Sequence, residues 1–186
     1  MKKLYLYLIA ILLLSAVNLF SQDFAKKGIW EIGGNISLSN TTEIRNGEAS
    51  ENSLSVFNLE TPIRYFVIDG LALGIVPSFQ SLSYNDWSAT GFGIYFAPSW
   101  NFEINDIVYP FIEGRVGYNS INDEDFRGGI AWAVVGGIKV QVGNSALVGM
   151  GLSYSQITLE RDNHEGDRNG ENILSLNIGI ALFLGD

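Results

Sequence analysis

The sequence contains no cysteine and only one histidine. Without cysteine the chain cannot form disulfide bonds, so its stability has to come from its secondary structure and its surroundings. The single histidine, His164, lies among acidic residues with no serine within two positions, which indicates a solvated loop residue rather than a general base. We therefore predict that the protein is not an enzyme and carries no catalytic residue.

Basic charge is also scarce, and helical patterning is missing after residue 22. The 11 lysines and arginines stand against 20 aspartates and glutamates, which gives a formal net charge of −9 and argues against nucleic acid as a partner. Residues 1–21 are typical of a signal peptide, with basic Lys2-Lys3, apolar Leu4–Leu14 and a more polar end. A membrane-spanning helix needs about 20 apolar residues, and Ser15 and Asn18 interrupt the run too early. We predict a single exported domain over residues 22–186.

Strict apolar–polar alternation fills that domain. In Leu59–Phe79 two alternating segments flank Asp69-Gly70, a two-residue hairpin signal. A change of parity between Val56 and Leu59 predicts a β-bulge near Phe57. Counted along the whole domain, the alternation predicts eight strands, at about 28–40, 53–68, 71–84, 90–102, 108–119, 129–142, 146–159 and 172–184.

The connections between these strands alternate between long and short. Long polar loops are predicted at 41–52, 85–89, 120–127 and 160–171, and tight turns at 69–70, 103–106 and 143–145. Barrels of the outer membrane have this arrangement, with short periplasmic turns and longer external loops. The sequence therefore predicts an all-β fold, an eight-stranded antiparallel up-and-down transmembrane β-barrel. The alternative is a soluble antiparallel barrel or sandwich with its apolar side inward.

The residue sizes on the two sides of the strands favour the membrane barrel. One side carries large apolar residues on every strand, too much volume for an eight-stranded interior, whereas the other is rich in glycine, serine, alanine and asparagine. Aromatic residues fall at both ends of the apolar side, as membrane-interface anchors do. The predicted interface aromatics are Trp30, Tyr65, Trp100 and Phe102 at the turn end, and Phe79, Phe92, Tyr118, Trp132 and Tyr154 at the loop end.

Three segments, PIRYFVIDGLALGI, FAPSWNFEINDIVYPFIEGRVGY and GGIKVQVGNSALVGMGLSY, are similar to the small outer membrane protein β-barrel domain family, the OmpW/OmpX-like eight-stranded barrels of diderm bacteria. The resemblance covers nearly the whole mature chain. It implies a porin-like cell-envelope protein in the outer membrane, inserted by the barrel assembly machinery. Family members commonly end on an aromatic residue, whereas this chain ends Phe183-Leu184-Gly185-Asp186, with Phe183 on the lumen side.

Charged residues on the small-residue side form the main candidate site. This lumen charge cluster comprises Glu31, Glu60, Arg64, Glu113, Arg115 and Lys139. Since a buried charge is costly unless it is paired, we expect Glu31 to approach Arg64 and Glu113 to approach Lys139. We interpret the cluster as a neutral plug that fills the barrel; a gate or ion relay is the alternative.

The external loops supply the second candidate feature, a set of acidic residues. We interpret them as a solvated surface; the alternative is binding of divalent cations shared with lipopolysaccharide phosphates. The segment Asp162–Glu171 does not fit the calcium-loop pattern, and we predict no metal and no cofactor. The residues are Glu43, Glu48, Glu51, Asp123, Glu124, Asp125, Asp162, Glu165, Asp167 and Glu171.

Together these features predict a monomer with a largely filled polar lumen and a structural or surface-interaction role. Its partners are membrane lipids and lipopolysaccharide. The alternative function is a narrow channel or transporter for small or hydrophobic solutes.

Overall fold

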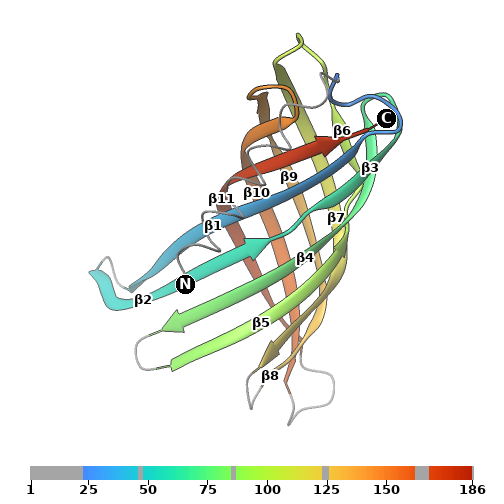
Figure 1. Ribbon diagram of the computed structural model, residues 1–186. Helices are drawn as coiled ribbons and strands as arrows, with labels where there is room; N and C mark the ends of the chain where they lie inside the picture. The colour runs from blue at the N-terminus through green and yellow to red at the C-terminus, as the bar shows by residue number, and fades with distance from the viewer. Residues whose placement is uncertain (1–22, 46–47, 85–86, 123–125, 162–167, 186) are drawn as a thin grey trace, which may run out of the picture.

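The computed structural model describes residues 23–45, 48–84, 87–122, 126–161 and 168–185. These residues form a single antiparallel sheet that closes on itself, with β11 beside β1 (Figure 1). The strands are β1 (Trp30–Arg45), β2 (Glu48–Glu60), β3 (Ile63–Ile68), β4 (Leu71–Tyr84), β5 (Trp87–Phe96), β6 (Ser99–Asn101), β7 (Val108–Asn122), β8 (Phe126–Arg127), β9 (Gly129–Gln141), β10 (Ala146–Arg161) and β11 (Arg168–Leu184).

The eleven segments form eight continuous lengths of barrel wall, which we call staves, because three of these lengths are each interrupted once. β2 continues into β3 across Thr61-Pro62, and β5 continues into β6 across Ala97-Pro98. Proline has no N–H to give to the ladder, so the pairing breaks there without ending the stave. β8 and β9 are likewise separated only at Gly128. The predicted eight-stranded antiparallel barrel is confirmed.

The Asp69-Gly70 turn is also present as predicted. Ile68 pairs with Leu71, which leaves two residues in the turn, and Gly70 has a φ of 80°. That backbone conformation is strained for a residue with a Cβ, which explains why glycine occupies it. The turn therefore joins β3 to β4 as a tight hairpin.

The predicted bulge near Phe57 is wrong. β2 pairs with β4 without a break from Leu54 to Glu60, and Phe57 and Leu59 face outward together. Val56 points inward, where it lines a cavity. The parity change predicts a bulge only if Val56 faces outward, and the interior of this barrel is not entirely polar. Within the described residues the register shifts instead between Thr42 and Ile44 of β1 and between Phe66 and Ile68 of β3.

The strands extend further than predicted at the end of the barrel opposite the tight turns. β1 and β2 pair as far as Arg45 and Glu48, and β10 and β11 as far as Glu160 and Arg168. Much of the predicted loops 41–52 and 160–171 is therefore strand. Backbone N–H and C=O groups pair whatever the polarity of the side chains, so the ladders continue beyond the apolar region. His164 and the side chains of the ten acidic loop residues lie outside the described residues.

The two faces of the wall differ sharply in chemistry. Large apolar side chains point outward and are exposed, with Leu38 at 72% and Ile180 at 70%, whereas charged Arg64 points inward and is only 3% exposed. Such a surface is stable in lipid, and closure of the sheet satisfies the backbone there. Within the described residues, no helix is long and apolar enough to cross a membrane.

Gly117 on β7 lies where two backbones approach closely. A Cβ at Gly117 would overlap the carbonyl oxygen of Ile94 on β5, which cannot move without disturbing the ladder. We expect Gly117→Ala to lower the free energy of unfolding by about 1–3 kcal/mol, measured by urea titration in lipid vesicles. Gly114→Ala is the matched control on the same strand, since its Cβ would meet nothing within 4 Å. Equal losses for the two variants would contradict this explanation.

Candidate functional site

The lumen charge cluster lies inside the barrel, and all six of its members are buried. Arg64 on β3 occupies the middle of it. Its Nη1 donates to Glu31 Oε1 at 2.9 Å, and its Nη2 lies 2.6 Å from Glu113 Oε2. One arginine on the second stave therefore joins a carboxylate on β1 to a carboxylate on β7.

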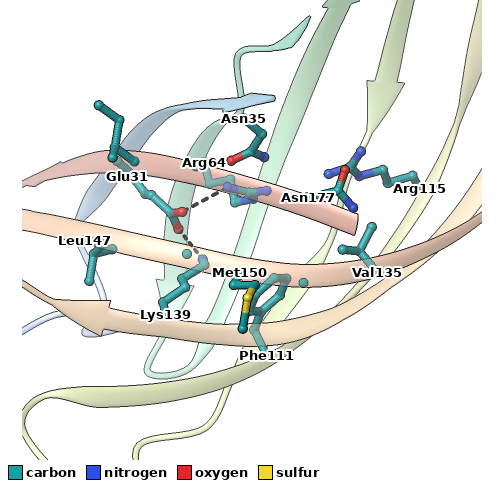
Figure 2. A pocket seen from close by; sticks show the side chains of 15 residues that line it. Glu31, Asn35, Arg64, Phe111, Arg115, Val135, Lys139, Leu147, Met150 and Asn177 are labelled. Atoms are coloured by element: carbon teal, nitrogen blue, oxygen red, sulfur yellow. Dashed lines mark hydrogen bonds and ion pairs between the residues drawn. The ribbon is translucent and has the colours of Figure 1, made fainter. Parts of the chain in front are cut away.

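Each end of this trio continues into a further ion pair. Arg115 donates from Nε to Glu113 Oε1 at 2.7 Å and from Nη1 to Glu60 Oε1 at 2.6 Å. At the other end, Lys139 Nζ donates to Glu31 Oε2 at 2.7 Å, and Figure 2 shows Glu31 between Lys139 and Arg64. The six residues thus form one chain of alternating charge: Glu60, Arg115, Glu113, Arg64, Glu31, Lys139.

The structure brings Glu31 and Arg64 together, but it pairs Glu113 differently from the expected partner. Glu113 bonds to the two arginines, whereas Lys139 bonds to Glu31 and, at 2.9 Å, to Asn101 Oδ1. The register explains the difference. Glu113 lies opposite Val135 in the β7–β9 ladder, and Lys139 lies opposite Tyr109, four residues away along β7.

The alternation of positive and negative groups lowers the free-energy cost of burying these six side chains. Burying a single ion is expensive, and the cost falls only when its partners and hydrogen bonds are in place. Three carboxylates face three cations, so the cluster is electrically neutral as a whole. The geometry fits a fixed cross-link between staves, because each arginine is held by two carboxylates at once.

An aromatic cluster that the sequence analysis missed fills the end of the barrel next to the tight turns. Phe24 is completely buried there, with its ring edge-on to Phe66 at 5.2 Å and to Tyr109 at 5.0 Å between centroids. Phe183 lies 5.4 Å away and, as predicted, points into the lumen. We call Phe24, Phe66, Tyr109 and Phe183 the aromatic seal.

The segment before β1 holds Phe24 in place. The carbonyl of Ala25 accepts a hydrogen bond from Gly70 N at 2.8 Å, and Gly28 N donates to the carbonyl of Phe66 at 2.9 Å. Lys26 Nζ lies 2.8 Å from a carboxylate oxygen of Glu103, and this hydrogen bond raises the pKa of the lysine above its ordinary value. Residues 23–29 therefore form an ordered segment that closes the turn end of the barrel. Its signal in the sequence was Phe24, a large apolar residue in a mostly polar stretch before the first predicted strand.

Two small cavities lie within the interior, and Arg115 lines both. The inner cavity provides about 40 Å³ for the centres of water-sized molecules and is also lined by Glu31, Arg64 and Lys139 (Figure 2). The outer cavity provides about 50 Å³ and is lined by Glu60 and by several serines. The charge chain separates the two.

Eight of the nine predicted interface aromatics lie on the outward face of the strands, and Phe102, directly after β6, is exposed as well. At the turn end Trp30 contacts Tyr65, with 4.9 Å between ring centroids. At the loop end Trp132 lies 5.8 Å from Tyr154, and its Nε1 donates to Gln156 at 2.9 Å. Paired rings with a polar tip are suited to a membrane–water interface. Among the described residues, no group of three or more histidines, aspartates or glutamates could hold a metal ion.

Comparison with known proteins yields structural matches but no match in sequence. No family model matches the chain, and no curated protein matches it either. The outer membrane protein OprG from Pseudomonas aeruginosa is 13% identical, with a TM-score of 0.57 over 87% of this chain and 98% of that one. Neisserial surface protein A is 14% identical, with a TM-score of 0.58 over 84% and 97%. A de novo designed transmembrane β-barrel is 12% identical, with a TM-score of 0.53 over 86% and 98%.

These matches confirm the predicted fold, that of the small outer membrane barrels. The two natural proteins are an outer membrane protein and a surface protein. Together with the exposed apolar outer face of the wall, they support the predicted location in the outer membrane. The match to a designed barrel shows that the fold alone does not specify an activity.

Proposed function

We propose that this chain is a sealed barrel of the outer membrane with a structural or surface-interaction role. The observation that carries the proposal is the continuous charge chain from Glu60 to Lys139. It links β1, β2, β3, β7 and β9 through the middle of the lumen, where a permeating ion would have to pass. The aromatic seal, completed by Phe24, supports the same conclusion at the turn end.

The proposed partners follow from the outer surface. Membrane lipids and lipopolysaccharide contact the exposed apolar outer face of the wall. Because the outer face of the described wall is largely apolar and suited to lipid, we propose a monomer that is inserted by the barrel assembly machinery. No catalytic role is proposed.

A narrow channel is the second candidate, favoured by one observation. The inner and outer cavities both reach Arg115, so movement of this one side chain would connect them. In that case the charge chain would act as a gate rather than a plug.

Single-channel recording in planar bilayers separates the two candidates. For the purified wild-type protein we expect no steady conductance above the membrane leak, because the charge chain and the aromatic seal block the lumen in series. A steady, ion-selective conductance that disappears in Arg64→Ala would contradict the plug and establish the channel. Glu103→Ala, which changes an exposed carboxylate at the turn end, is the control for non-specific effects.

A further inference from the structure

The outer cavity contains a buried carboxylate that the protein satisfies only on one side. Glu60 is 5% exposed, and its Oε1 accepts hydrogen bonds from Arg115 Nη1 at 2.6 Å and from Asn58 Nδ2 at 3.1 Å. Its other oxygen, Oε2, has no hydrogen-bond partner in the described part of the chain, and neither does Asn58 Oδ1. Both residues line the outer cavity.

Two acceptors in a buried cavity call for a hydrogen-bond donor. A buried polar atom without a partner is costly, and a charged one more so, which is why native structures leave few of them. The rest of the cavity wall offers hydroxyl groups that can both donate and accept. They belong to Ser37, Ser39, Ser153, Ser155 and Ser175.

The inner cavity lacks this feature and serves as an internal comparison. There Glu31 has both oxygens bound by the protein, Oε1 by Arg64 and Oε2 by Lys139. No carboxylate oxygen of the described residues around it needs another donor. The demand for an occupant is therefore specific to the outer side of Arg115.

We propose that the outer cavity is a hydration site, which holds a cluster of water molecules anchored on Glu60 Oε2 and Asn58 Oδ1. Its volume of about 50 Å³ accommodates roughly three to five waters, at 10–15 Å³ for each molecule centre. A neutral occupant fits better than a cation, because the charge chain already balances three carboxylates against three cations. Water then hydrates Arg115 from the outer side, while protein groups alone hold Arg64 and Lys139.

A crystal structure of the wild-type protein at a resolution that shows ordered solvent tests this proposal. We expect water within about 2.7–3.2 Å of Glu60 Oε2 and of Asn58 Oδ1. Ser37→Val adds a methyl group to the cavity beside Asn58, its partner in the β1–β2 ladder, and should displace at least one of these waters. Ser83→Val is the matched control; the same change on the outward face should leave them in place.

Two results would overturn the proposal. One is a wild-type structure in which Glu60 Oε2 bonds to a protein group and no ordered solvent lies in the cavity. The other is an anomalous peak beside Glu60 in crystals soaked in rubidium chloride, which would show that the site binds a monovalent cation. The wild-type crystal decides the question even if Ser37→Val does not fold, and its outcome is independent of the conductance measurement.

Discussion

Glu113→Ala should lower the free energy of unfolding by about 3–5 kcal/mol, measured by urea titration of the protein refolded in lipid vesicles. Glu113 is 1% exposed and is the only carboxylate bound by both arginines of the charge chain. Its removal leaves Arg64 and Arg115, both buried in the lumen, with one carboxylate each, Glu31 and Glu60. The loss reflects an unbalanced buried positive charge more than the loss of attraction itself.

Two control variants make the explanation specific. Glu103→Ala removes a carboxylate of the exposed pair with Lys26, and an exposed pair contributes about 0–1 kcal/mol. Glu113→Gln keeps the shape of the side chain but not its charge, and it should lose nearly as much stability as Glu113→Ala. If Glu113→Ala cost no more than Glu103→Ala, the charge chain would not be a structural cross-link.

Phe24→Ala should cost about 3–5 kcal/mol in the same assay, because it removes a completely buried ring and leaves a cavity. The ring touches Phe66, Tyr109 and Phe183, and Lys139 Nζ lies 5.2 Å from its centroid. Since Phe24 is the part of the aromatic seal that precedes the barrel wall, its loss should open the turn end without breaking any β-ladder.

Phe24→Leu is the graded control, since a substitution of similar volume in a packed cluster usually costs less than about 1.5 kcal/mol. Limited proteolysis gives a second readout. Cleavage after Lys26 or Lys27 by trypsin should be slow in the wild type and in Phe24→Leu, and much faster in Phe24→Ala. Equal cleavage rates in all three would show that the segment is not held by the seal.

The sequence predicted the barrel because the relevant signals are local. Alternation with a period of two decides which side chains face lipid and which face the lumen, and it placed Glu31, Arg64 and Phe183 inside without knowledge of any contact. The Asp69-Gly70 turn is equally local, since glycine adopts the required positive φ without the strain that a Cβ would cause. Val56 shows the limit of this rule, because an apolar residue there faces inward.

Only the tertiary structure decided which interior groups meet. The partner of each charge depends on the register between staves, which placed Lys139 opposite Tyr109 and beyond reach of the partner expected for it. The aromatic seal depends on a segment that belongs to no strand, so alternation could not assign Phe24 to the lumen. The local pattern of the sequence was thus sufficient for the wall of the barrel and for the face of most strand residues. Closure of the sheet decided the contents, because groups distant along the chain meet inside only once the wall has curved around them.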